Sequence, residues 1–214
     1  MTPAAWVPLA LAGAFAVIDW LGVVHARRGL RWVGKPATIL LLMGVALTLR
    51  PVSDVQRNLF VAALFLSLFG DVYLLLTGEK WFRAGLAAFL AAHLAYGAGF
   101  LEAGVKVGLL AISTPAVALV SIVAGSQVIR SVRRAAGTKG AVVPVALYLL
   151  AISTMVALAG AGGRPVAIAG ALLFYLSDGL IGWSRFVRPL PWAPLPIIVT
   201  YHLAQAALVV SLAR

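Results

Sequence analysis

The chain has 214 residues, of which 63% are hydrophobic and 11% are charged, and its mean hydropathy is +1.04. So few charged residues cannot give a soluble domain a polar surface, which excludes a conventional soluble fold. The net charge of +11 does not indicate nucleic-acid binding, because most basic residues lie in short connections between apolar stretches, as in membrane proteins. The absence of Cys excludes disulfides, thiolate metal sites and a cysteine nucleophile.

Eight apolar stretches are long enough to cross a bilayer or nearly so. They run from Ala4 to Val24, Pro36 to Leu49, Leu59 to Thr77, Phe82 to Leu101, Val107 to Ile129, Ala141 to Gly160, Pro165 to Phe186 and Ala193 to Leu212. The first has no basic segment before it and is interpreted as a retained span rather than a signal peptide. The prediction is an all-α polytopic membrane protein, a bundle of eight transmembrane helices in a single domain over residues 1–214.

The connections set the expected orientation. Twelve of the 17 Lys and Arg fall in the first, third, fifth and seventh connections, and five in the even connections and the termini. Positive charge marks the cytoplasmic side, so the odd connections are expected there, including the break at Gly137 to Gly140.

Two carboxylates lie inside predicted spans. Asp71 belongs to the stretch FLSLFGDVYLLL at 65–76, and Asp178 to GALLFYLSDGLIGW at 170–183. A carboxylate within the membrane is costly, faces the bundle interior or a wet cavity, and marks a functional site. With the predicted orientation both fall in the cytoplasmic half and are expected to share one cavity.

Other polar residues are predicted at a similar depth. Pairs three or four residues apart share a helix face, as Tyr175 does with Asp178, and Tyr201 with Gln205. The predicted pocket residues are Lys35, His93, Tyr96, Tyr175, Ser177, Tyr201, His202 and Gln205.

The order of these segments resembles the YhhN family of integral membrane proteins. The resemblance rests on Lys35-Pro36, on FLSLFGDVYLLL, on FRAGLAAFLAAHLAY at 82–96, on Tyr148 with Met155, on GALLFYLSDGLIG at 170–182 and on YHLAQAAL at 201–208. It implies eight helices and hydrolysis of the vinyl-ether bond of lysoplasmalogens to a fatty aldehyde and glycerophosphocholine or glycerophosphoethanolamine. The implied partners are a lysophospholipid substrate and the bilayer, without nucleic acid, and the expected location is the bacterial inner membrane.

Vinyl-ether cleavage begins with proton transfer to the outer vinyl carbon, and water then captures the oxocarbenium ion. A pair of carboxylates, one protonated and one ionised, can supply the acid and orient the water. Asp71 and Asp178 are therefore the predicted catalytic residues, without a cofactor or metal, and the sequence does not say which is the acid. Lys35 is placed where it would bind the lipid phosphate as a point charge, or it marks a cytoplasmic helix end.

Several alternatives stay open. The two aspartates could only hydrogen-bond neighbouring helices, or the two His and two Asp could bind a zinc ion that activates water, although no H-x-x-x-H spacing occurs. The chain could instead be a small transporter or proton-coupled carrier that uses the same carboxylates, or a noncatalytic scaffold. Asp19 is expected to pair with Arg27 or Arg28 rather than to take part in chemistry.

Overall fold

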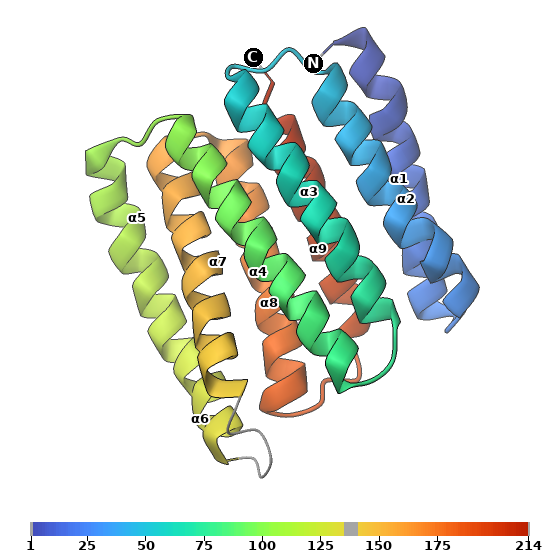
Figure 1. Cartoon of the computed structure of the whole chain (residues 1–214), viewed down its shortest axis with the longest axis vertical. Helices are drawn as coiled ribbons and strands as arrows, with labels where there is room; N and C mark the ends of the chain where they lie inside the picture. Colours follow the sequence, from blue (N-terminus) through green and yellow to red (C-terminus); the bar gives the residue numbers. More distant parts are fainter. Residues whose placement is uncertain (1, 135–140, 214) are drawn as a thin grey trace.

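The protein is an all-α assembly of antiparallel helices joined by short connections (Figure 1). A computed structural model describes residues 2–134 and 141–213, which contain the eight helical segments predicted from hydropathy. The segments are α1 (Pro3–Val24), α2 (Arg28–Thr48), α3 (Asp54–Leu75), α4 (Glu79–Glu102), α5 (Val107–Val120) continuing through the π-helix η1 (Ser121–Gly125) into α6 (Ser126–Arg134), α7 (Val142–Gly162), α8 (Pro165–Phe186) and α9 (Pro194–Val210).

The helices have the length and composition of membrane spans. Seven of them, with α5 to α6 counted as one span, are long and apolar enough to cross a bilayer, and α9 is a shorter apolar helix of 17 residues. Large apolar side chains remain exposed on the outer surface of several helices. These faces fit a lipid environment, in which exposed apolar side chains carry no cost.

The boundary of α2 differs from its predicted position. The hydropathy pattern starts this span at Pro36, whereas the helix begins at Arg28 and includes Arg31 and Lys35. These basic side chains have partners on other helices, which lets the helix extend into a charged segment. The predicted break at Gly137 to Gly140 lies outside the described residues.

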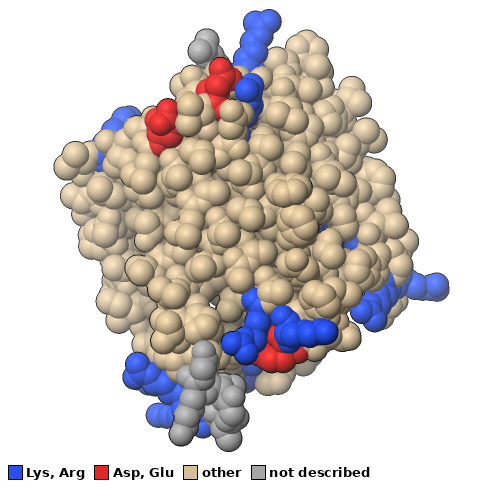
Figure 2. Space-filling model, viewed as in Figure 1, with Lys and Arg blue, Asp and Glu red and all other residues tan. Residues whose placement is uncertain are grey.

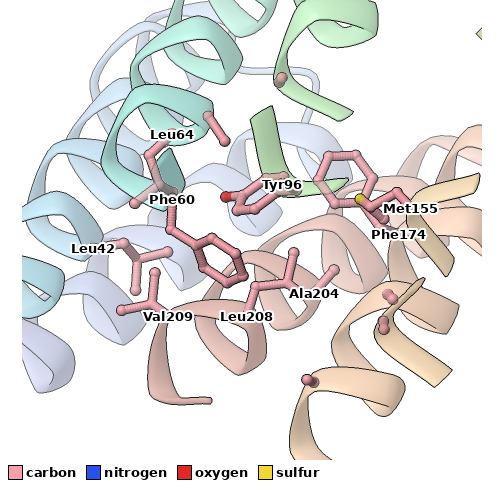
Figure 3. Packing of buried hydrophobic residues seen from close by; sticks show 14 of the residues in the cluster. Leu42, Phe60, Leu64, Tyr96, Met155, Phe174, Ala204, Leu208 and Val209 are labelled. Atoms are coloured by element: carbon pink, nitrogen blue, oxygen red, sulfur yellow. The ribbon is translucent and has the colours of Figure 1, made fainter. Parts of the chain in front are cut away.

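Helix α9 occupies an inner position, where it packs against α1, α2 and α8. Helix α3 packs on α2 and α4, and α4 packs on α7. Helix α5 packs chiefly on α7 at the edge of the bundle (Figure 1). Phe60 of α3 packs edge-on against Tyr96 and Phe100 of α4, with ring centroids 4.9 and 5.2 Å apart. Figure 3 shows Phe60 and Tyr96 in this packing, with Leu208 and Val209 of α9 nearby.

Charged residues gather towards the two ends of the bundle. The visible face in Figure 2 is almost uncharged between these ends, as expected of a surface covered by hydrocarbon. The chain ends lie together at one end of the bundle (Figure 1), where Arg164 donates a hydrogen bond to the Ala213 carbonyl at 2.6 Å. The other end carries the connections from α1 to α2, from α3 to α4 and from α8 to α9 (Figure 1), which are odd-numbered connections.

Candidate active site

Asp71 of α3 forms a buried ion pair. Its side chain is fully buried, and its Oδ1 lies 2.8 Å from the ammonium nitrogen of Lys35 on α2, which is only 7% exposed. The Tyr201 hydroxyl of α9 donates a 2.7 Å hydrogen bond to Asp71 Oδ2. Lys35 therefore lies within the bundle and not at a helix end where it could meet a lipid phosphate, which corrects the predicted helix-end position.

Two further predicted residues extend this cluster. Gln205, one turn after Tyr201, donates through Nε2 to the Tyr201 hydroxyl at 3.2 Å. Tyr96 of α4 donates in turn to Gln205 Oε1. The predicted pairing of Tyr201 with Gln205 on one helix face is confirmed, and the network connects α2, α3, α4 and α9.

Asp178 of α8 has different neighbours. The Tyr148 hydroxyl of α7 donates a hydrogen bond to its Oδ2, and His93 Nε2 of α4 lies 3.5 Å from the same oxygen. His93 is completely buried, whereas the Asp178 side chain is 9% exposed. No Lys or Arg side chain is paired with Asp178 among the described residues.

Aromatic side chains lie around and between the two carboxylates. The Phe174 ring centroid is 4.7 Å from that of His93, on the Asp178 side, and 5.4 Å from that of Tyr201, on the Asp71 side. Phe89 contacts both Phe174 and Tyr201.

A cavity of about 90 Å³ opens beside Asp178. Its lining residues are mostly apolar or aromatic, and Asp178 is the only charged residue among them. The residues come from the end of α3, from α4, α7 and α8, and from the η1 and α6 segment; they are Leu74, Phe82, Leu86, Phe89, Ala124, Gly125, Val128, Val145, Tyr148, Leu149, Ile152, Tyr175, Asp178, Gly179, Ile181, Gly182, Trp183 and Phe186. Asp71 lies buried behind this lining, so the expectation of one cavity bordered by both carboxylates is not met in the described structure.

Two predicted pocket residues face other helices. The Ser177 hydroxyl donates to the Ile197 carbonyl at 3.0 Å. His202 Nδ1 accepts a 3.1 Å hydrogen bond from the Trp20 indole of α1, and its Nε2 lies 3.9 Å from Asp19 Oδ2. Both side chains are buried away from the cavity.

Asp19 pairs with a different arginine from the predicted ones. Its Oδ1 lies 3.3 Å from Arg31 Nε, because the extended α2 brings Arg31 alongside α1. Arg28 instead donates to the Leu75 carbonyl at 2.9 Å, and Arg27 is the residue that precedes α2. The expectation that Asp19 is paired with an arginine is confirmed, but its partner is Arg31 and not Arg27 or Arg28.

Tyr148 is a neighbour of Asp178 that the sequence indicates only through the family resemblance. A tyrosine in the interior of an apolar span is nevertheless a usable signal, because a buried hydroxyl needs a hydrogen-bond partner. Phe174 was also missed, because an aromatic residue in an apolar helix resembles ordinary packing.

The side chains required for zinc binding are divided among separate places. His93 lies near Asp178, His202 lies near Asp19, and Asp71 is paired with Lys35. Among residues 2–134 and 141–213, no group of three or more His, Asp or Glu side chains could hold a metal ion. The described geometry therefore gives no support to the zinc alternative.

Comparison with known proteins identifies the family of this chain. The YhhN family model matches residues 30–212. The chain belongs to the YhhN family.

Named relatives extend the comparison. The chain is 35% identical over 180 residues to lysoplasmalogenase TMEM86B from Homo sapiens, covering 84% of this chain and 74% of that protein. It is 31% identical over 185 residues to lysoplasmalogenase TMEM86B from Sus scrofa, covering 86% and 76%, and 28% identical over 223 residues to a lysoplasmalogenase from Mycobacterium bovis, covering 95% and 85%. No solved structure matches the chain.

The matched part of this YhhN protein contains both carboxylates and the whole cavity lining. Asp19 and the whole of α1 precede it. The cavity and the two carboxylates thus lie within the segment that defines the family.

Proposed function

We propose that this YhhN protein is a lysoplasmalogenase-like hydrolase that cleaves the vinyl-ether bond of a lysoplasmalogen within the membrane. The observation that supports this most directly is the position of Asp178, whose carboxylate lies at the edge of an otherwise apolar cavity and accepts a hydrogen bond from Tyr148. A cavity of this kind suits an apolar ligand with one reactive polar group. The names of the similar proteins support the same reaction.

In the proposed reaction, protonated Asp178 acts as the general acid. Tyr148 and His93 both approach Oδ2, which leaves Oδ1 to carry the proton. The proton passes to the outer vinyl carbon, forming a C–H bond and an oxocarbenium ion, and Asp178 becomes a carboxylate. Water then adds to the oxocarbenium carbon and returns a proton to Asp178, and the hemiacetal collapses to a fatty aldehyde and the glycerol hydroxyl.

Asp71 would act from behind the cavity wall. Held by Lys35 and Tyr201, it would contribute negative potential near the oxocarbenium ion without touching the substrate, because electrostatic interactions remain strong in an apolar interior. This divides the two predicted catalytic roles: Asp178 contacts the substrate, and Asp71 is an electrostatic and positioning residue.

The cavity volume of about 90 Å³ suits the vinyl-ether end of the chain, while the rest of the hydrocarbon would stay among lipid tails. The substrate would reach it from the leaflet at the end of the bundle that carries the odd-numbered connections. In a bacterial inner membrane with the predicted orientation, this is the cytoplasmic leaflet.

The test is aldehyde release from a lysoplasmalogen by the purified protein in detergent or vesicles. We expect Asp178→Asn to lower the rate by about 100-fold or more, the usual contribution of a general acid, and Tyr148→Phe to lower it less. Asp54→Asn, which changes a 75% exposed carboxylate at the other end of α3, is the matched control and should keep full activity.

Two results would contradict the proposal. One is a wild-type protein that is folded but releases no aldehyde, and the other is full activity in Asp178→Asn. Proton-coupled transport by the same vesicles, without lipid turnover, would instead favour the carrier alternative.

A further inference from the structure

A second, polar groove adjoins the cavity at the end of the bundle that carries the odd-numbered connections. It has a volume of about 230 Å³ and is lined by Leu74, Leu76, Gly78, Glu79, Phe82 and Arg185. Leu74 and Phe82 line both the groove and the Asp178 cavity. A single ligand could therefore occupy the two spaces, with an apolar part in the cavity and a polar part in the groove.

The distance between the two spaces is set by α8. Asp178 and Arg185 are seven residues apart, so they lie on nearly the same face of the helix, separated by about 10 Å along its axis at 1.5 Å per residue. Ile181 and Gly182, between them, line the cavity. An arginine side chain can cover part of this distance, so its guanidinium can meet a phosphate that lies a glycerol unit away from a vinyl ether at Asp178.

Glu79 and Arg185 provide one charge of each sign in the groove. The Arg185 guanidinium donates to Glu79 Oε2 across the gap between α4 and α8, and it lies 4.7 Å from the centre of the Phe82 ring. The two side chains are 62% and 48% exposed, so a ligand can reach both. Lys35, in contrast, is buried against Asp71 and is not available to a headgroup.

We propose that the Glu79 and Arg185 groove binds the headgroup of a zwitterionic lysophospholipid, with Arg185 on the phosphate and Glu79 on the ammonium group. This inference rests on the proposed function, since it assumes that the vinyl ether lies at Asp178. Guanidinium groups bind phosphate through two parallel hydrogen bonds, and the Phe82 ring restricts Arg185 to the groove. When the phosphate replaces Glu79 as the partner of Arg185, the Glu79 carboxylate becomes free to pair with the ammonium group.

The charge pattern explains why a zwitterion fits. A headgroup with both charges replaces the ion pair of Arg185 and Glu79 by two new pairs, Arg185 with the phosphate and Glu79 with the ammonium group. No charge in the groove then loses its partner. An anionic phosphate without an amine would leave Glu79 unpaired beside it, and a neutral glycerol would leave the ion pair as it is. The groove thus distinguishes headgroups by sign and number of charges rather than by size.

The competing interpretation is a surface ion pair that only links α4 to α8. Exposed pairs of this kind contribute little to stability, so both interpretations predict folded variants. They differ in substrate dependence, because a structural link would affect every substrate alike.

The experiment measures kcat and KM of the full-length protein for three vinyl ethers: the ethanolamine lysoplasmalogen, the same alkenyl chain on glycerol 3-phosphate, and the free 1-alkenylglycerol. We expect Arg185→Gln to raise KM at least tenfold for the two phosphorylated substrates and to leave the alkenylglycerol unchanged. Glu79→Gln should weaken only the ethanolamine substrate. Lys80→Gln, which removes an exposed neighbouring cation that lies over Trp81, is the matched control and should behave like the wild type.

A second readout separates this inference from the proposed reaction. Binding of the saturated 1-O-alkyl lysophosphoethanolamine, which has no vinyl ether to cleave, can be measured by calorimetry with the wild type and the same variants. Weaker binding in Arg185→Gln would support the headgroup site even if no aldehyde is released. Equal loss for all three substrates, or binding unchanged in both variants, would overturn it.

Discussion

Burying the ion pair of Lys35 and Asp71 costs a large desolvation free energy, although neither side chain lines the cavity. Two charges removed from water lose several kcal/mol of hydration each, and their mutual attraction compensates only when the geometry is good. Here Lys35 Nζ lies 2.8 Å from Asp71 Oδ1, and Tyr201 satisfies the other oxygen at 2.7 Å. A pair maintained at this cost is more easily explained by electrostatics at the site than by stability.

The first residue-scale prediction compares stability with activity. Lys35→Met should destabilise the protein by about 3 kcal/mol, because removing one partner leaves a buried charge unpaired. The double variant Lys35→Met with Asp71→Leu should recover most of this loss, since an apolar pair of similar volume is tolerated, but it should not recover aldehyde release. Thermal unfolding in detergent measures the first effect and the aldehyde assay the second.

Asp54→Asn provides the reference for this comparison. Asp54, whose side chain is 75% exposed, pairs with Arg57, so replacing this solvated carboxylate should change stability by less than about 1 kcal/mol. Normal activity in the double variant would show that the ion pair is only structural.

Sequence predicted the depth of both aspartates but could not predict all of their neighbours. Tyr201 and His202 are consecutive, and consecutive residues point about 100° apart on a helix. Tyr201 therefore reaches Asp71, while His202 meets Trp20. The position of a residue along its helix sets its depth in the membrane. The neighbours of its side chain depend on which helices pack against each face, and the sequence does not show this.

At the scale of helices, hydropathy located all eight segments because hydrocarbon-facing residues must be apolar. It placed the start of α2 too late, since the charged turn of Arg28 to Lys35 depends on partners in α1 and α3. It also gave no indication of η1, the π-helical turn at Ser121–Gly125. In that turn the Ser121 hydroxyl lies within 2.8 Å of the hydroxyl of Ser153 and within 2.7 Å of that of Tyr175, which is a tertiary contact.

The element-scale prediction uses two glycines on the same helix. A Cβ on Gly34 would lie 2.6 Å from the Asp19 backbone nitrogen of α1, whereas a Cβ on Gly44 would meet only Pro8 Cβ, at 3.9 Å. Small residues allow membrane helices to approach this closely. Gly34→Ala should therefore force α1 and α2 apart and destabilise the protein by about 1 to 3 kcal/mol.

Gly44→Ala is the matched control for this change. It should be neutral or stabilising by up to about 1 kcal/mol, because alanine favours helix more than glycine does. Unfolding in detergent measures both variants. Equal stability of the two would show that α1 and α2 are less tightly packed at Gly34 than the structure indicates.

At the scale of the whole molecule, the site has a gradient of polarity. The groove with Glu79 and Arg185 lies at one end of the bundle, the Asp178 cavity lies deeper, and the Lys35 and Asp71 pair is buried behind it. A single-chain lipid has the same order from headgroup to vinyl ether. The side of the membrane that this end faces therefore decides which leaflet can supply the substrate.

The last prediction tests that orientation. The chain has no native Cys, so single substitutions give an unambiguous label. Lys80→Cys, exposed beside the groove, should react with a membrane-impermeant maleimide only after the membrane is opened. Lys106→Cys, exposed at the opposite end of the bundle, should react in intact cells. Both outcomes follow from the excess of Lys and Arg in the odd-numbered connections, which positive charge keeps on the cytoplasmic side. If Lys80→Cys reacts in intact cells and Lys106→Cys does not, the groove faces the outer leaflet, and substrate supplied from outside would reach Asp178 without crossing the membrane.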